Sequence, residues 1–270
     1  MANWLHEEGM VQGTRTRQED DFGVFELPPE LEAGELLLVL ADGMGGAQGG
    51  ARASALAVST FIESYDAVVA ATIPERLERT LLQVNARMAL ETARAPEELD
   101  GMGCTLLAVV LTAEGLYWIS VGDSPLWLWR RGCLLRLNQD HAYRTVLAQQ
   151  VSTGELSADV AARHPARNAL ISAVTGEDLE LVDLSRRAFA LHHNDGILLA
   201  SDGLLTLSEQ EITRVLRGAW SSGSACQALL AAITAHDHPH QDNVTVLWAR
   251  AAVDPTLSVW RRWWQALRRI

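Results

Sequence analysis

The amino-acid sequence predicts an α+β protein in which sheets pack as a sandwich and pairs of helices cover them. Seven short apolar or β-branched runs, each bounded by Gly, Pro or Asp, have the length of strands. Four longer segments show helical spacing and occur as two pairs that separate groups of successive strands. Because single strands and single helices do not alternate, a doubly wound parallel sheet is disfavoured. The 270 residues, 48% of them hydrophobic, suffice for one domain with a large core.

The predicted strands share an apolar, β-branched or aromatic composition. In chain order they are 21–27, 35–41, 104–112, 115–122, 125–132, 195–201 and 243–251. The run at 35–41 is continuously apolar from Leu36 to Ala41, which is typical of a strand buried on both faces.

The first pair of predicted helices covers 49–64 and about 74–95. The first helix begins after a glycine-rich turn and is rich in small residues that allow close packing on a sheet. The second helix carries five apolar residues near helical spacing, which are Leu77, Leu81, Val84, Met88 and Leu90.

The second pair covers about 208–217 and 224–235. The segment Ser208 to Glu211 reads SEQE and predicts a capping box at the start of the first of these helices.

Four aspartates lie where a predicted strand meets a turn. Asp42, Asp123 and Asp202 follow apolar strands, and a fourth, Asp242, precedes one. A single aspartate at such a position is most often a turn residue or a helix cap. Four carboxylates that converge would repel one another unless cations neutralised them, and carboxylates with backbone carbonyls are the ligands that Mg²⁺ and Mn²⁺ prefer. The pattern therefore indicates a metal site.

Two neighbouring segments support this interpretation. Five glycines within residues 43–50 follow Asp42, and glycine permits turns and close approaches that a side chain would forbid. Near the N-terminus, Arg15, Glu19 and Asp20 lie just before the first of the predicted strands. An arginine beside a metal cluster is suited to a bidentate grip on phosphate.

Together these motifs resemble the metal-dependent type 2C (PPM) protein serine/threonine phosphatases, bacterial branch. The motifs, in order, are TRTRQEDD, LADGMGG, GCTLL, VGDSP, ASDGL and QDNVTV, and the resemblance runs from about Val11 to Val246. It implies a four-layer α/β/β/α sandwich of two antiparallel sheets flanked by helix pairs, with a dinuclear metal site at one edge. The chain shows no internal repeat and no Gly/Ser linker, so we expect one catalytic domain over 1–255, followed by a short tail at 256–270.

The resemblance implies a role for each acid. Asp42 would bridge two Mn²⁺ or Mg²⁺ ions, and the Gly43 carbonyl would bind one of them. Asp202 and Asp242 would complete the shell of the other ion. These assignments follow from the matching motif positions.

The remaining site residues are expected around those ions. Glu19 and Asp20 resemble the acids that hold metal-bound water, and Arg15 resembles the residue that clamps the phosphate. Asp123, together with Asp202, resembles the pair that supports a third, weaker ion.

The implied activity is hydrolysis of phosphoserine and phosphothreonine in proteins by a metal-activated water, in opposition to a bacterial serine/threonine kinase. Two ions about 4 Å apart lower the pKa of a bridging water and neutralise charge on the phosphoryl oxygens. Two other functions stay open: a non-catalytic, phosphatase-like binding or regulatory module, and a two-metal hydrolase of small phosphorylated molecules. Retention of all the expected acids argues against the first of these.

Some motif positions depart from the family pattern. Met44 stands where eukaryotic members have a proton-donating histidine, so another group or water must protonate the leaving oxygen. Pro125 replaces an arginine in VGDSP, and Gln18 replaces the usual asparagine before Glu19 and Asp20.

Several other residues are more simply explained as structural. Three histidines alternate in the loop HDHPHQDN, at 236, 238 and 240, and solvent-facing side chains are favoured there over a zinc site or a substitute proton donor. Cys104 is expected to be a buried thiol. Residues 144–176 resemble the mobile flap of the family, with an ordinary helical insertion as the alternative.

The composition excludes some classes of function. A net charge of −12 argues against nucleic-acid binding. All 22 basic residues are arginine, so Schiff-base and Walker-lysine mechanisms are excluded. Three widely separated cysteines and the lack of a signal-like or membrane-spanning stretch favour a cytoplasmic protein.

The C-terminal segment 257–270 predicts an amphipathic docking helix. Its apolar face would carry Trp260, Trp263, Trp264, Leu267 and Ile270, and its basic face Arg261, Arg262, Arg268 and Arg269. Attachment to a membrane surface or a partner is as compatible with this pattern as docking on the protein itself.

Overall fold

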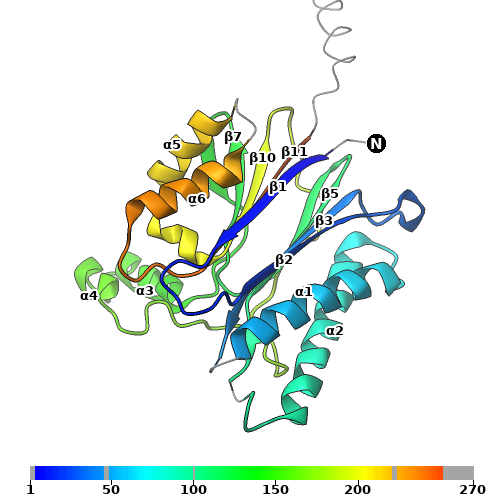
Figure 1. The fold of residues 1–270 in the computed structure, drawn as a ribbon, viewed down its shortest axis with the longest axis horizontal. Helices are drawn as coiled ribbons and strands as arrows, with labels where there is room; N and C mark the ends of the chain where they lie inside the picture. The colour runs from blue at the N-terminus through cyan, green and yellow to red at the C-terminus, as the bar shows by residue number, and fades with distance from the viewer. Residues whose placement is uncertain (1–3, 46–48, 100, 221–223, 252–270) are drawn as a thin grey trace, which may run out of the picture.

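The computed structural model describes residues 4–45, 49–99, 101–220 and 224–251. In these ranges two antiparallel sheets pack face to face, and a pair of helices covers the outer side of each (Figure 1). This arrangement confirms the predicted α/β/β/α sandwich.

One sheet has five strands. Their spatial order is β1 (Trp4–Val11), β11 (Val244–Ala251), β10 (Gly196–Ala200), β7 (Leu126–Arg130) and β8 (Cys133–Arg136). The helices α5 (Glu209–Ala219) and α6 (Ala225–His236) cover it (Figure 1). The capping box at Ser208 and Glu211 is present at the start of α5, as predicted.

The other sheet has six strands. Their order is β2 (Asp20–Glu26), β3 (Leu36–Met44), β5 (Leu106–Thr112), β6 (Gly115–Val121) and β9 (Asp183–Leu184), and β4 (Gly103–Cys104) pairs with β3. The helices α1 (Gly49–Ala67) and α2 (Ile73–Arg94) cover this sheet (Figure 1).

Strand β3 shows why this architecture needs a continuous apolar run. Leu37, Val39 and Ala41 face the cluster under α1 and α2. The alternate residues Leu36, Leu38 and Leu40 face the other sheet. Both faces of the strand are buried, so both sets of side chains are apolar.

A third apolar cluster lies between the five-stranded sheet and helices α5 and α6. It contains Trp127, Trp129 and Trp248. The indole of Trp220 packs on this cluster, with its ring centroid 6.3 Å from Trp129 and 6.1 Å from Trp248. Aromatic rings thus fill the space between this sheet and its helices.

The structure corrects one residue of the predicted helix 74–95. Leu90 is 58% exposed, whereas the next residue, Glu91, is buried. The periodic positions Leu81, Val84 and Met88 continue to Glu91, whose carboxylate pairs with Arg52 and Arg94. An ion pair therefore ends the apolar stripe of this helix.

Five further strands and helices were not predicted separately. They are β1, β8, β9, α3 (Tyr143–Ser152) and α4 (Ala158–Ala162). The helices α3 and α4 lie in the insertion at 144–176 and show that this part of the chain is helical. Two short 3₁₀ turns occur at Pro29–Leu31 and Asp202–Thr206.

The predicted tail at 256–270 and its docking helix at 257–270 lie outside the described residues. Every helix in the described part of the chain is too short or too polar to cross a bilayer.

Candidate functional site

A cavity of about 720 Å³ opens at the edge of the sandwich where strands of both sheets end. Seven of the eight predicted site residues line it, and these are Arg15, Glu19, Asp42, Gly43, Asp123, Asp202 and Asp242. The eighth, Asp20, is buried beside Asp42. A cavity of this size is typical of small-molecule and active sites.

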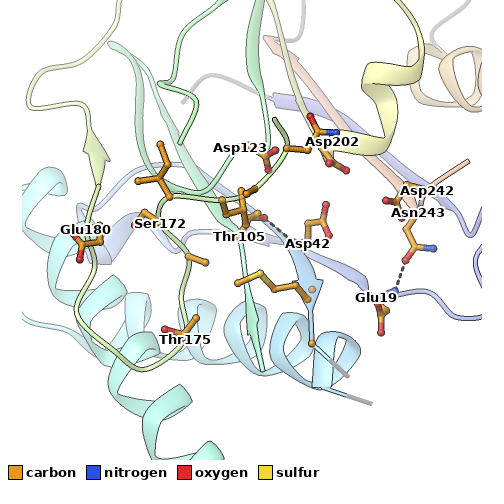
Figure 2. A pocket seen from close by; sticks show the side chains of 18 of the residues that line it. Glu19, Asp42, Thr105, Asp123, Ser172, Thr175, Glu180, Asp202, Asp242 and Asn243 are labelled. Carbon is orange, nitrogen blue, oxygen red and sulfur yellow. Dashed lines mark hydrogen bonds between the residues drawn. The ribbon is translucent and has the colours of Figure 1, made fainter. Parts of the chain in front are cut away.

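The two sheets contribute different acids to this cavity. Asp42 lies on β3 and Asp123 follows β6, both in the six-stranded sheet. Asp202 follows β10 and Asp242 precedes β11, both in the five-stranded sheet. Figure 2 shows these four aspartates and Glu19 around one open space. The sandwich therefore brings together acids that lie far apart in the sequence.

Asp20 and Asp42 are directly opposite each other on the antiparallel strands β2 and β3. The Asp20 Oδ2 atom accepts hydrogen bonds of 2.8 Å from the hydroxyls of Ser201 and Thr245. Its Oδ1 atom is buried and has no hydrogen-bond partner among the described residues. Like charges directly opposite on neighbouring strands destabilise a sheet, and the free oxygen lacks the cation or donor that would offset the repulsion.

Burial and mutual repulsion shift the pKa of these carboxyl groups. Burial, followed by the charges of Asp20 and Asp202, raises the pKa of Asp42 well above its ordinary value. Burial, followed by the charges of Asp123 and Asp242, raises the pKa of Asp202 to about 7. Burial is also the largest cause that raises the pKa of Asp20, to about 6. The site favours a positive charge or protons.

A close backbone approach builds the floor of the site. Gly43, at the end of β3, lies against the start of α1, and a Cβ there would collide with the backbone carbonyls of Gly50 and Glu19. The Gly43 N–H donates to the Glu19 carbonyl at 3.0 Å. Glycine at position 43 thus lets strand, helix and the Glu19 loop meet, and Gly43 itself lines the cavity.

Asn243 holds the loop that carries Arg15 and Glu19. Its Oδ1 atom accepts the Glu19 N–H at 2.8 Å, and its Nδ2 atom donates to the carbonyls of Gln12 and Arg17. The neighbouring Asp242 forms an ion pair with Arg15. The Arg15 Nη2 atom lies 2.6 Å from the Asp242 Oδ2 atom, and both side chains are partly exposed. Arg15 is therefore at the solvent side of the acids.

Asp123, like Asp242, has a cationic partner, but its ion pair is much less exposed to solvent. It is 3% exposed, and Arg144 Nη2 lies 3.0 Å from its Oδ2 atom. Burial raises the pKa of Asp123, and the charge of Arg144 opposes that shift. The sequence indicated the acid but not this arginine, which comes from helix α3.

Oxygen atoms dominate the donors around the cavity, and this set suits Mg²⁺ or Mn²⁺ better than a soft metal. The paired, desolvated acids and the unpartnered Asp20 Oδ1 atom also fit a cationic group. Within the described ranges no three carboxylate, imidazole or thiol groups are already close enough to hold one ion. The acids are thus spaced around the cavity.

The structure shows where Met44, the three alternating histidines and Cys104 lie. Met44 lines the cavity, and no histidine is among the described residues that do. His236, His238 and His240 are exposed, which agrees with the solvent-facing interpretation. Cys104 is fully buried, and burial, with the nearby charge of Asp42, raises the pKa of its thiol far above the ordinary value. It is a structural thiol.

Sequence reasoning missed the groups that support the acids. Thr105 accepts the Asp42 N–H at 3.0 Å and shares a hydrogen bond of 2.8 Å with Ser124. Ser201 and Thr245 bind Asp20, and Gln18 accepts the Asp20 N–H at 3.1 Å. Each lies within three residues of a flagged acid or of Cys104, so polar residues inside these motifs were the available signal.

The model of the family Protein phosphatase 2C matches residues 14–235. The serine/threonine phosphatase stp of Listeria monocytogenes is 30% identical over 250 residues, which cover 90% of this chain and 94% of stp. The serine/threonine protein phosphatase PstP of Mycobacterium tuberculosis is 32% identical over 218 residues, which cover 80% of this chain and 40% of PstP.

Among solved structures, the catalytic domain of PstP in complex with two manganese ions is similar to this chain. The TM-score is 0.73 and the identity 26%, and the likeness covers 92% of this chain and 98% of that one. Because the family model matches residues 14–235 and the similarity to stp covers 90% of this chain, the chain belongs to the protein phosphatase 2C family.

Proposed function

We propose that this chain is a metal-dependent protein serine/threonine phosphatase of a bacterium. One observation carries the proposal: acids from separate strand ends of both sheets, together with Gly43 and Arg15, line a single cavity. The names of stp and PstP support the choice of phosphorylated serine and threonine in proteins as substrates.

The proposed cofactor is a pair of Mn²⁺ or Mg²⁺ ions, and the manganese in the PstP structure supports this choice. The ions would supply the positive charge that activates water and stabilises the phosphoryl group during in-line displacement. Asp42, Asp202, Asp242 and the Gly43 carbonyl would hold them, and Glu19 with Asp20 would bind their water ligands. The raised pKa of Asp42, caused by burial and by its acidic neighbours, supports a cationic occupant.

Arg15 is the proposed phosphate-binding residue. Its guanidinium borders the cavity beside Asp242, and its partly exposed position leaves room for contact with phosphoryl oxygens. Met44 has no proton to donate to the leaving serine or threonine oxygen, and the cavity contains no histidine among the described lining residues. Water in the cavity is therefore the proposed proton source.

The experiment is Mn²⁺-dependent release of phosphate from phosphoserine and phosphothreonine peptides, compared with small aryl phosphates. Wild type, Asp42→Asn and the control Asp66→Asn, an exposed acid on α1, are measured side by side. We expect hydrolysis of both substrate types by wild type and the control, with higher kcat/KM for peptides, and none by Asp42→Asn. Hydrolysis of aryl phosphates alone would favour a small-molecule hydrolase, and no hydrolysis at all would favour a binding module.

The proposal extends to the source of the substrates, the cellular compartment and the C-terminal segment. A serine/threonine kinase would supply the phosphoproteins. Cys104, Cys133 and Cys226 are free thiols, which suits the reducing cytoplasm. The proposed docking segment 257–270, which follows a catalytic domain over 1–255, would attach the enzyme to an anionic membrane surface or a partner. Binding to anionic vesicles, compared between the full chain and one lacking 257–270, tests membrane attachment through this segment. Equal binding by the two chains would contradict membrane attachment.

A further inference from the structure

A partly buried arginine from the helical insertion lies against the acidic site. Arg144, in the first turn of α3, places Nη2 3.0 Å from Asp123 Oδ2 and Nε 2.6 Å from Asp140 Oδ2. The three side chains are only 17%, 5% and 15% exposed, respectively. Such a pair persists because separating it would leave desolvated charges without partners.

A second arginine completes the network. Arg136, on β8, donates from Nη2 to the Asp123 carbonyl at 2.9 Å, and its Nη1 lies 3.3 Å from Asp140 Oδ2. Two guanidinium groups therefore balance the two carboxylates. In contrast, neither Asp42 nor Asp202 forms an ion pair with an arginine or histidine of the described residues. Among Asp42, Asp123 and Asp202, only Asp123 is paired with a partly buried arginine of the described residues.

The backbone fixes Arg144 where it lies. The N–H groups of Tyr143 and Arg144 donate to the carbonyls of Ala169 and Arg167 at 2.9 and 2.8 Å. The Ile171 N–H donates to the His141 carbonyl at 2.8 Å. Because 168–173 line the cavity, helix α3 and the cavity wall are joined. The backbone of Arg144 is therefore held in place, and the ion pairs with Asp123 and Asp140 hold its guanidinium.

We propose that Arg144 occupies the position beside Asp123 and Asp202 that a third divalent cation would take, so that this chain binds two metal ions and not three. The inference rests on the proposed metal-dependent function. An incoming ion would have to displace a guanidinium that holds Asp123 on one side and repels the ion through its own charge. Arg144 is thus a positioning residue, since it holds Asp123 and contacts no reacting group.

The test counts Mn²⁺ ions bound to the full chain by isothermal titration calorimetry and by equilibrium dialysis. The variants are Arg144→Gln, Arg144→Lys and the control Arg163→Gln, an exposed arginine at the end of α4. We expect two ions for wild type, Arg144→Lys and Arg163→Gln, and a third, weaker ion for Arg144→Gln. Adding Asp123→Asn to Arg144→Gln should return the count to two.

Asp123→Asn alone tests the inference without altering Arg144, should Arg144→Gln not fold. If Arg144 excludes the third ion, Asp123→Asn still binds two Mn²⁺ ions. Loss of an outer-shell partner lowers metal affinity roughly 10-fold or more, and we expect a smaller reduction than this for Asp123→Asn. Three ions in wild type, two in a folded Arg144→Gln, or a lower count in Asp123→Asn would each overturn the inference while leaving a metal-dependent phosphatase intact. Wild type that binds no Mn²⁺ would overturn both proposals.

Discussion

At the scale of single residues, the site is a set of buried acids whose repulsion the protein tolerates. Asp20 and Asp42 are opposite each other on neighbouring strands, and Asp202 adds a third acid with a raised pKa. Such groups reduce the stability of the metal-free fold, because burial and like charges disfavour their ionised forms. Stability and the capacity to bind cations are therefore opposed at the same residues.

Replacing Asp42 by asparagine separates these two effects. The amide keeps the shape and removes the carboxyl group, so we expect a higher melting temperature for the metal-free protein at pH 8. Phosphatase activity should fall by more than about 100-fold, beyond the 10–100-fold typical of a lost outer-shell partner. Thermal unfolding in chelator and phosphopeptide kinetics with Mn²⁺ measure the two outcomes. A destabilised variant, or one with full activity, would contradict this assignment.

The stability of the metal-free protein should depend on pH in a direction set by the raised pKa values. Folded Asp20 and Asp202 titrate near 6 and 7, against an unfolded value near 4. Between those limits the folded state binds more protons than the unfolded state, so stability falls as pH rises from about 4 to about 7.

Melting temperatures in chelator from pH 5 to pH 8 test this trend, with each kcal/mol worth about 2–4 °C at this chain length. Saturating Mn²⁺ should reverse the trend, because the ions bind deprotonated carboxylates. A melting temperature in chelator that rises steadily towards pH 8 would be the wrong sign for this explanation.

Arg15→Ala should impair substrate binding and leave metal binding in place. The guanidinium pairs with Asp242 in the structure, so its loss frees a carboxylate rather than removing a ligand. We expect KM for a phosphopeptide to rise roughly 10- to 100-fold, as for a lost charged hydrogen bond, with Mn²⁺ affinity not lowered. Arg17→Ala, an exposed arginine in the same loop, is the control. Weaker Mn²⁺ binding without a change in KM would make Arg15 a structural partner of the acids.

At the scale of elements, the contact between β3 and α1 decides where Asp42 lies. A Cβ at Gly43 would come within 2.5 Å of the Glu19 carbonyl oxygen and would also collide with Gly50. Both obstacles are backbone, which cannot rotate away as a side chain can. The strand end, the helix start and the Glu19 loop therefore have one mutual arrangement.

Gly43→Ala should destabilise the protein by about 2 kcal/mol or more, as overpacking does in a close-packed interior, and should abolish activity. Gly218→Ala is the matched control. Gly218 is exposed in α5, with open space around its Cα, and alanine there should stabilise by about 0.5–1 kcal/mol. Denaturant midpoints measure both. A neutral Gly43→Ala would show that the close approach is not needed.

Element prediction from the sequence succeeded where burial imposes a pattern. Strand 35–41 and helix α2 were clear because the packed faces demand apolar residues at fixed spacing. Strand β1 was missed, since the polar residues His6, Glu7 and Glu8 interrupt its apolar ends. Its partner β11 also lies more than 200 residues away, with Trp4 opposite Ala251. Pairing of this kind depends on the whole chain and leaves little trace in local composition.

The candidate site could be predicted where its residues follow a local sequence pattern, and not where they depend on contacts between distant segments. Asp42, Asp123, Asp202 and Asp242 stand out together because an aspartate recurs at four places where an apolar strand meets a turn. Arg144 does not, because an arginine on a polar helix is ordinary and its contact with Asp123 arises only when α3 folds over the strand end. The unpartnered oxygen of Asp20 likewise depends on the register of β2 with β3.

At the scale of the whole molecule, the three apolar clusters are linked through the strands. Strand β3 gives one face to the cluster under α1 and α2 and the other to the cluster between the sheets. The strands β7, β10 and β11 connect that central cluster to the one under α5 and α6 in the same way. Loss of one layer therefore uncovers the next, which favours cooperative unfolding.

The uneven placement of the indole rings makes this cooperativity visible by spectroscopy. Trp127, Trp129, Trp220 and Trp248 lie on the α5/α6 side, while the cluster under α1 and α2 contains no tryptophan among its described members. Tryptophan emission therefore reports mainly on the α5/α6 side and on the space between the sheets, where Trp4 and Trp118 pack. Far-ultraviolet circular dichroism senses both helix pairs. We expect the two signals to share one denaturant midpoint. A circular dichroism midpoint at a lower denaturant concentration than the fluorescence midpoint would mean that α1 and α2 unfold first. The five-stranded sheet with α5 and α6 would then still be folded.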